Sequence, residues 1–274
     1  MEKMSPGCGM TGPELTGEQR RLAALRARLP EGRAGLLRWP EESDSTNLRL
    51  KAWAGEGAPE GSVFLAERQL AGRGRLGRSF ASPPGGLYLS YLLRPDRAPE
   101  DLGELTAWAA VAVRRAIGRC CGVFPEIKWV NDLMWEGRKL CGILCETALR
   151  RSRAESLVIG VGINVASSAE DFPPELREKA ASLAMTGCPL PERSALAAAV
   201  ILALDGLAAE FPAAGEAYWR EYREHCVTLG KEVELSDGAV AFAEELEEDF
   251  SLRLRFPDGS RSLLRSGEAT LHRE

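Results

Sequence analysis

Three arginines separated by glycines stand close together in this 274-residue sequence. The segment 72–78 reads G-R-G-R-L-G-R and carries Arg73, Arg75 and Arg78. Glycines let the backbone approach a ligand closely, and arginines donate paired hydrogen bonds to phosphate or carboxylate. Because the whole chain is acidic, with a net charge of -5, this segment is either an anion-binding loop or a solvated basic turn.

The same segment formally contains G-x-G-x-x-G, the fingerprint of dinucleotide-binding folds. That fingerprint requires a helix that begins inside the glycine run, so that the helix N-terminus faces the pyrophosphate. Here the run continues into S-F-A-S-P-P-G-G, residues 79–86, whose prolines and glycines oppose a helix. The sequence therefore argues against a Rossmann-type site.

A second polar group lies on a predicted β-hairpin over residues 127–146. Lys128, Asn131 and Asp132 lie at the end of its first strand, and Lys139 begins the second strand. The chain has 29 arginines and only six lysines, so two lysines in one short segment favour a specific role for the ammonium group. Structural roles explain the same residues, because Asn and Asp favour turns and charged residues protect edge strands.

Two more segments combine backbone access with polar side chains. The run V-I-G-V-G-I-N-V at 158–165 places Gly160 and Gly162 on one face of an apolar strand, so a helix or a ligand packs against the backbone there. Asn164 needs a hydrogen-bond partner if it is buried. The S-T-N segment at 45–47 either binds a polar ligand or caps the helix that follows it.

Hydrophobic periodicity predicts how these segments are positioned. We expect a first region, 1–34, with one short helix, then a region 35–227 that mixes strands and helices, and a region 228–274 of short strands that form a small β-barrel. Within the middle region, helices are predicted at 101–121 and over 173–226. Strands are predicted at 36–39, 61–67 and 87–93, and in three segments between 127 and 165.

Composition excludes several classes of protein. The longest apolar stretch, 195–204, is half of the ~20 residues that a membrane span needs, and the N-terminus has no apolar signal core, so we expect a cytoplasmic protein with no membrane partner. Seven scattered cysteines and two histidines argue against a zinc site and favour reduced thiols. The acidic balance disfavours non-specific nucleic-acid binding.

Taken in order, the motifs are far more specific than any one of them. They are S-T-N, Q-L-A-G-R-G-R-L-G-R, K-W-V-N-D-L with R-K-L-C-G-I-L-C-E, and G-V-G-I-N. From about Trp39 onward the chain resembles the biotin–protein ligase (biotin–acetyl-CoA-carboxylase ligase) family. The resemblance implies an α+β fold of the class II synthetase-like, biotinyl/lipoyl ligase type. In that fold, helices flank a central mixed β-sheet and a small β-barrel follows.

The resemblance also implies a reaction in two steps. Biotin is activated by ATP to biotinyl-5'-AMP, and a lysine of a biotin carboxyl carrier protein then attacks the adenylate. Arg75 and Lys128 match the catalytic cations of the family. The positions that match its biotin pocket are Ser45, Thr46, Asn47, Gln69, Gly72, Arg73, Gly74, Arg75, Lys128, Gly142, Gly160 and Gly162. Those that match its ATP and adenylate site are Arg73, Arg75, Arg78, Phe80, Lys128, Asn131, Asp132, Lys139 and Asn164.

Three positions depart from the family pattern. Phe80 stands where the family has a Trp that packs on the purine, Leu76 where an Arg is common, and Val130 where a Pro is usual. A phenyl ring can still stack, and neither of the other changes removes a required group.

The family reaction also implies Mg²⁺, which commonly binds through substrate phosphates with few protein ligands, so no metal ligand is assigned. Homodimers are common in the family. The 34 residues before the catalytic region leave no room for a helix-turn-helix, so we expect a ligase without a DNA-binding domain. Two alternatives are a lipoate or octanoate ligase, whose ligand lacks a ureido group, and a non-catalytic biotin-binding module, which would not need Arg75 and Lys128.

Overall fold

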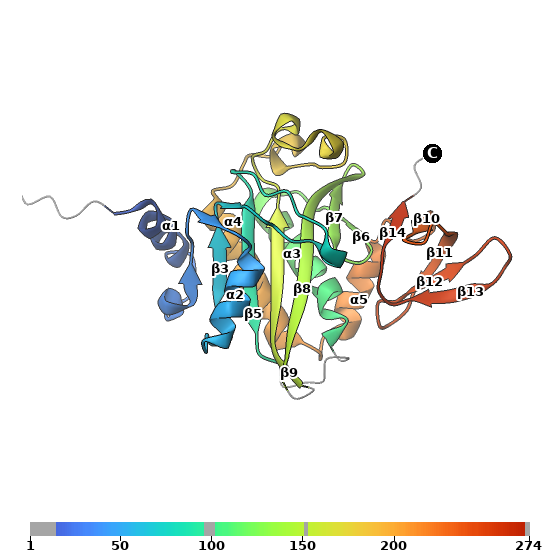
Figure 1. Cartoon of the computed structure of the whole chain (residues 1–274), viewed down its shortest axis with the longest axis horizontal. Coiled ribbons are helices and arrows are strands. Elements are labelled where there is room, and N and C mark those ends of the chain that lie inside the picture. Colours follow the sequence, from blue (N-terminus) through green and yellow to red (C-terminus); the bar gives the residue numbers. More distant parts are fainter. Residues whose placement is uncertain (1–14, 96–101, 151–152, 272–274) are drawn as a thin grey trace, which may run out of the picture.

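A seven-stranded mixed sheet forms the centre of the computed structural model, which describes residues 15–95, 102–150 and 153–271 (Figure 1). The strand order is β1-β3-β5-β9-β8-β7-β6, in which β1 and β3 are parallel and all other neighbours are antiparallel. The strands are β1 (Leu37–Arg38), β3 (Val63–Ala66), β5 (Leu87–Leu93), β6 (Glu126–Lys128), β7 (Asp132–Trp135), β8 (Arg138–Arg150) and β9 (Arg153–Ile163).

Helices pack on both faces of this sheet. One face carries α2, which contacts β3, β5 and β9, and the opposite face carries α3 and α4, which pack against each other (Figure 1). Helix α5 lies against α3, and α1 lies against α4. The bounds are α1 (Gly17–Arg26), α2 (Thr46–Gly55), α3 (Leu105–Cys121), α4 (Arg193–Glu210) and α5 (Gly215–Glu224). The predicted α+β architecture with a mixed central sheet is confirmed.

Helix α3 is buried along most of its length because the sheet, α4 and α5 all pack against it. Its Ala- and Val-rich sequence suits this close packing, and Trp108 is fully buried. The Trp108 ring stacks on Tyr218 of α5 with 4.1 Å between ring centroids. Gly122 ends the helix in the left-handed conformation, with φ of 72°, which a glycine adopts at little cost.

The prediction of continuous helix over 173–226 is wrong in its first part. Residues 173–192 form irregular chain with two short 3-10 turns, η5 (Pro174–Leu176) and η6 (Leu183–Thr186), before α4 begins. Prolines at 173, 174, 189 and 191 remove backbone donors and clash with a preceding helical turn, so a regular helix cannot form there. The predicted N-terminal helix is present as α1, whereas residues 1–14 lie outside the described part of the chain.

The last strands pair among themselves in a five-stranded antiparallel sheet of order β13-β12-β11-β10-β14. They are β10 (Glu232–Leu235), β11 (Val240–Leu246), β12 (Leu252–Arg255), β13 (Arg261–Leu264) and β14 (Ala269–Leu271). The expected small C-terminal β-structure is therefore present, and in the described residues β13 and β14 are its two edges rather than a closed seam. The boundary at residue 227 stays a prediction.

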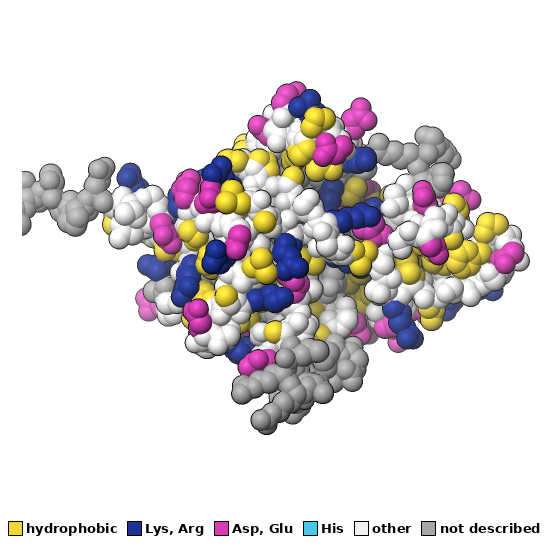
Figure 2. Space-filling model, viewed as in Figure 1, with side chains coloured by type: hydrophobic (Ala, Val, Ile, Leu, Met, Phe, Trp, Pro, Cys, Tyr) yellow, Lys and Arg dark blue, Asp and Glu magenta, His cyan; other side chains and the backbone are white. Residues whose placement is uncertain are grey.

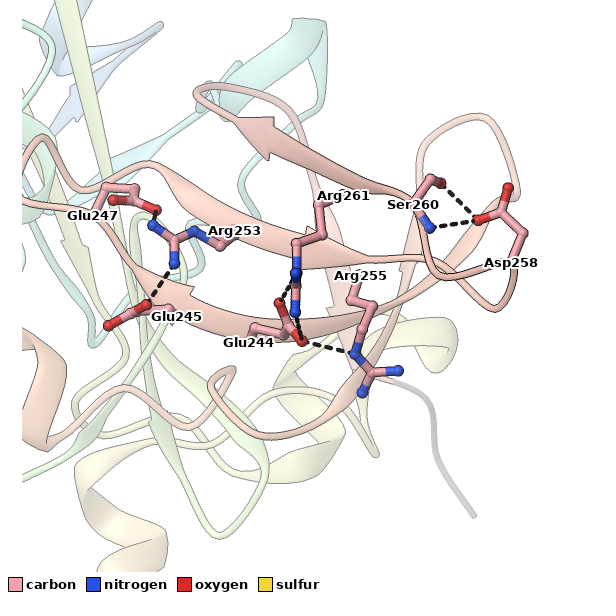
Figure 3. A network of polar contacts seen from close by, with 8 residues as sticks. All are labelled: Glu244, Glu245, Glu247, Arg253, Arg255, Asp258, Ser260 and Arg261. Atoms are coloured by element: carbon pink, nitrogen blue, oxygen red, sulfur yellow. Dashed lines mark hydrogen bonds and ion pairs between the residues drawn. The ribbon is translucent and has the colours of Figure 1, made fainter.

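An ion-pair network covers part of this C-terminal sheet (Figure 3). Glu244 accepts hydrogen bonds from Arg255 and Arg261, while Arg253 bridges Glu245 and Glu247. The two arginines hold the pKa of the Glu244 carboxyl below its usual range. Pairs this exposed contribute little to stability, so the network mainly keeps a thin sheet polar on its outer side.

Trp129 ties the two sheets together. Its backbone N–H donates to the Thr228 hydroxyl at 3.0 Å, and its indole N–H donates to the Phe250 carbonyl at 2.8 Å. The side chain is 3% exposed, so both hydrogen bonds are shielded from water. Trp219 of α5 makes a similar bond to the Glu247 carbonyl at 2.8 Å. The tryptophan of K-W-V-N-D is thus a structural residue.

Two sequence-based expectations concern the environment of the chain. In the described residues no helix is both long and apolar enough to cross a bilayer. The six described cysteines are free thiols, and burial raises the pKa of Cys145 to about 11 and that of Cys121 to about 12, so these thiols are poor nucleophiles at neutral pH.

Trp129→Phe tests the link between the sheets. Removing the indole donor leaves the buried Phe250 carbonyl without a partner, so we expect a loss of about 1–3 kcal/mol in the free energy of unfolding. Urea denaturation measures this loss. The matched control is Trp53→Phe, because Trp53 is half-buried beside Arg38, 4.0 Å from its ring centroid, and should lose no more than about 1 kcal/mol. Equal losses in both variants would contradict the role of Trp129.

Candidate active site

The predicted ligand-binding residues converge on one cleft, with about 450 Å³ of empty space that is partly open to solvent. The N-terminus of α2, the Gly/Arg loop and the strands β8 and β9 form its walls. The predicted residues that line it are Ser45, Thr46, Asn47, Gln69, Arg73, Gly74, Arg75, Phe80, Asn131, Lys139, Gly142, Gly160 and Gly162. Sequence reasoning missed Ile143 and Leu144, which follow Gly142 on β8, and Val161, which lies between Gly160 and Gly162 on β9.

Neutral hydrogen-bonding groups occupy the end of the cleft next to α2. Thr46 donates its backbone N–H to Gln69 Oε1 at 2.8 Å, and Gln69 Nε2 donates to the Ser82 hydroxyl at 2.8 Å. Ser45 takes the N-cap position of α2, yet its hydroxyl makes no capping hydrogen bond. The helix-cap interpretation of this segment is therefore correct for the backbone, while the Ser45 hydroxyl remains available to a ligand.

Asn47 of helix α2 and Phe80, which follows the Gly/Arg loop, pack against the glycines of β8 and β9. A methyl group at Gly160 would lie 2.2 Å from Asn47 Oδ1, and one at Gly162 would lie 2.5 Å from the Phe80 ring. The same ring would be 2.9 Å from a methyl group at Gly142. Asn47 and Phe80 thus approach the three glycines directly, while the glycines also line the cleft, and their contact with a ligand stays a prediction.

The Gly/Arg loop is held by its own backbone. Phe80 N–H donates to the Gly72 carbonyl at 2.9 Å, and Gly74 N–H donates to the Arg78 carbonyl at 2.7 Å. Only a three-residue 3-10 turn, η2 (Arg75–Gly77), occurs inside it, with Leu76 left-handed at φ of 54° and exposed. No α-helix starts in the glycine run, which agrees with the argument against a Rossmann site.

The three arginines of this loop point to three different partners. Arg75 donates to Asn131 Oδ1 at 3.1 Å across the cleft, and Arg73 lies 3.4 Å from a Glu146 carboxylate oxygen. Arg78 instead forms an ion pair at 2.5 Å with Glu268 of the C-terminal sheet and does not line the cleft. In the described structure, therefore, only Arg73 and Arg75 reach the cleft itself.

Lys128 lies near the ion pair formed by Lys139 and Asp132. Lys139 Nζ is 2.7 Å from Asp132 Oδ1 and 5.6 Å from the centroid of the Phe80 ring. Lys128 is opposite Asp132 across the β6–β7 pairing, and in the described residues no carboxylate lies within ion-pair distance of its ammonium group. Burial lowers the pKa of Lys128, with Lys139 adding to the shift and Asp132 opposing it.

Not every predicted residue lines the cleft. Gly72, Arg78, Lys128, Asp132 and Asn164 lie outside its lining. Asn164 is 4% exposed and donates to the carbonyls of Ala181 at 2.9 Å and Lys139 at 3.3 Å, so it braces the strand that carries Lys139. Its Oδ1 has no hydrogen-bond partner in the described structure. Direct ligand contacts by these five residues stay predictions.

This geometry suits a ligand with a neutral polar head and an anionic end. Hydroxyl and amide groups line one end of the cleft, and Arg75, Lys139 and Phe80 line another part. On the face seen in Figure 2, basic and acidic side chains are interspersed, so the local cations of the cleft do not belong to a broad basic surface.

Comparisons with known proteins agree with this arrangement. Residues 39–164 match the model of the biotin/lipoate A/B protein ligase family. The Mycobacterium tuberculosis H37Rv protein named biotin–[acetyl-CoA-carboxylase] ligase is 32% identical over 241 residues, which cover 84% of this chain and 86% of that protein. This chain belongs to the biotin/lipoate A/B protein ligase family. The resemblance read from the motifs is confirmed.

Other members of the family show where the match extends. A Bacillus spizizenii protein named bifunctional ligase/repressor BirA is 38% identical over 162 residues, or 59% of this chain. The chain spans about half the length of that relative. Among solved structures, the Aquifex aeolicus biotin protein ligase in complex with biotin and ATP aligns with a TM-score of 0.73 and 29% identity, covering 87% of this chain and 99% of that one.

Gly160→Ala tests whether Asn47 is seated on the bare backbone of β9. The added methyl group would collide with Asn47 Oδ1, so we expect a loss of about 1–3 kcal/mol in the free energy of unfolding. The control, Gly206→Ala in α4, meets no atom within 4 Å and should stabilise the protein by up to about 1 kcal/mol. Thermal or urea unfolding measures both changes, and a neutral Gly160→Ala would contradict the close approach.

Proposed function

We propose that this protein is a biotin–protein ligase. It activates biotin with ATP to biotinyl-5'-AMP and transfers the biotinyl group to a lysine of the biotin carboxyl carrier protein of acetyl-CoA carboxylase. The observation that carries the proposal is the meeting, in one cleft, of a neutral hydrogen-bonding pocket with the cations Arg75 and Lys139. Family relatives named as biotin ligases support it.

The neutral end of the cleft suits a ureido group, which has two N–H donors and one carbonyl acceptor. Gln69 uses one Nε2 hydrogen for Ser82 and retains a second that can donate to a carbonyl. The Ser45 hydroxyl can donate or accept, because it makes no hydrogen bond to the helix. Lipoate and octanoate carry no ureido group, so these buried polar groups would be left unpaired by them.

The cationic part brings two anions together. The biotin carboxylate attacks the α-phosphorus of ATP, a new acyl–phosphate bond forms, and pyrophosphate leaves. Arg75, oriented by its hydrogen bond to Asn131, and the ammonium group of Lys128 stabilise the charge that develops on the phosphate oxygens. Lys139, held by Asp132, lies over the Phe80 ring, which stacks on the adenine.

The biotinyl group is then transferred to the carrier protein in the same site. The ε-amine of the carrier lysine attacks the acyl carbon, the acyl–phosphate bond breaks, and AMP leaves. The described residues contain no group of three or more His, Cys, Asp or Glu side chains that could hold a metal, so we derive no step through Mg²⁺ and expect it to arrive on the phosphates of ATP. Homodimerisation stays a prediction.

Biotin-dependent exchange of labelled pyrophosphate into ATP tests the proposal. We expect exchange with biotin and none with lipoate, with octanoate or without ligand. Exchange with lipoate or octanoate instead would identify the protein as the corresponding ligase. Binding of biotin without any exchange would identify a binding module and overturn the enzymatic proposal.

Arg75→Ala and Lys128→Ala should each lower the exchange rate about 10²–10³-fold, because each removes a cation that stabilises developing phosphate charge. The matched control is Arg68→Ala. Arg68 pairs with Glu42 outside the cleft, so this variant should stay within about twofold of the unchanged protein. A similar loss in all three variants would point to a general charge effect and contradict the assigned roles.

The lowered pKa of Lys128 predicts the alkaline side of the pH profile. The protonated form stabilises phosphate charge, so kcat/KM for exchange should fall as pH rises through a pKa below the ordinary 10.5 of lysine. Lys128→Arg keeps the charge at all accessible pH values and should move that fall upward, even though its maximal rate is lower. An unchanged alkaline limb in Lys128→Arg would show that another group titrates.

A further inference from the structure

Glu146 collects three donors from two separate segments of the site, although it does not line the cleft. It lies on β8, and its side chain is 17% exposed. Asn47 Nδ2 donates to its Oε2 at 2.9 Å, Lys51 Nζ lies 3.3 Å from Oε1, and Arg73 Nη1 lies 3.4 Å from the same oxygen. Asn47 and Lys51 come from successive turns of α2, and Arg73 comes from the Gly/Arg loop.

A carboxylate only accepts hydrogen bonds, so Glu146 determines which way the Asn47 amide faces. Asn47 Nδ2 must point to Glu146, and it also reaches the Leu144 carbonyl at 3.3 Å. The Asn47 Oδ1 then faces the fully buried Ser90, whose hydroxyl is 2.5 Å away. If the Asn47 amide were flipped, its oxygen would face the Glu146 carboxylate. Its N–H₂ group would then lie against the backbone of Gly160, where Asn47 Oδ1 packs closely in the structure.

The orientation of Asn47 passes to the groups that line the pocket. The single hydrogen of the Ser90 hydroxyl can be donated to Asn47 Oδ1 at 2.5 Å or to the Thr46 hydroxyl at 2.8 Å. When it is donated to Asn47, the shorter contact, Ser90 can only accept from Thr46. The single Thr46 hydrogen is then donated within the protein, either to Ser90 or to Gln69 Oε1 at 3.2 Å, so the hydroxyl presents a lone pair toward the cleft. Gln69 Oε1 is already occupied by the Thr46 N–H, which leaves Gln69 Nε2 as the donor beside it.

We infer that Glu146 is a positioning residue that sets the donor and acceptor pattern of the ligand head-group pocket through Asn47 and Ser90. This inference rests on the proposed function, because the head group is taken to be the ureido ring of biotin. The pattern is an acceptor at Thr46, which Glu146 sets through Asn47 and Ser90, and a donor at Gln69, which the Thr46 N–H sets. Such a pair matches one ureido N–H and the ureido carbonyl.

Comparing variants of Lys51 and Glu146 distinguishes this positioning role of Glu146 from a purely structural one. Lys51 touches Glu146 and makes no hydrogen bond within the cleft, so Lys51→Ala removes the ion pair and leaves the Asn47 contact intact. Glu146→Gln keeps the size of the side chain, but its amide can present either an oxygen or an N–H₂ group to Asn47. Only the second variant releases the orientation of Asn47.

Isothermal titration calorimetry with biotin and, separately, with ATP tests the inference. Hydrogen bonds to charged groups contribute enough that we expect Glu146→Gln to weaken biotin binding about 10- to 100-fold. ATP binding should change less than about threefold, because the Arg73 contact is long and partly exposed. Lys51→Ala should leave the affinity for biotin within about threefold.

Ser90→Ala provides an independent variant at the next link of the chain. It should also weaken biotin binding by about tenfold and spare ATP, and urea denaturation checks that each variant is folded. Equal losses in Glu146→Gln and Lys51→Ala, or unchanged biotin affinity in both Glu146→Gln and Ser90→Ala, would overturn the inference. Failure of the unchanged protein to bind biotin would instead overturn the proposed function.

Discussion

The pairing of β8 with β9 sets Gly142 directly opposite Gly162 and Leu144 opposite Gly160, and the candidate site depends on this register. The glycines leave bare backbone in the middle of an otherwise apolar sheet. Asn47 and Phe80 fill the space that side chains would occupy, and they bring α2 and the Gly/Arg loop down onto the strands. A shift of one residue would put Ile143 and Val161 on that face and exclude both side chains.

The polar side chains beside the glycines of β8 and β9 are linked to one another by hydrogen bonds. Glu146, Asn47, Ser90, Thr46 and Gln69 form a chain of hydrogen bonds that runs from α2 and β8 through β5 to β4 (Arg68–Gln69). Thr46, Asn47 and Ser90 are buried, so each has few alternative partners and the orientation of one constrains the next. This is the physical basis for assigning ligand selectivity to residues that the ligand does not touch.

The cations are arranged by a different part of the fold. Arg75 is oriented by Asn131, Lys139 by Asp132, and Arg78 by Glu268 of the C-terminal sheet. Trp129, one residue after Lys128, anchors the same hairpin to Thr228 and Phe250. The C-terminal sheet therefore touches the cationic side of the site through both the Gly/Arg loop and the hairpin, while the neutral side is built from α2, the central sheet and β4.

Periodicity was enough to predict most of the strands and helices, because it reports on neighbours in the chain. The mixed sheet and most of the cleft residues were implied by the resemblance of the ordered motifs to a known family. Tertiary structure decided which of these residues meet. That Phe80 covers Gly142 and Gly162, that Arg78 leaves the cleft for Glu268, and that Glu146 orients Asn47 all depend on strand register and helix packing between segments far apart in sequence. Such contacts are settled only when the whole core closes, so no local pattern of residue types encodes them.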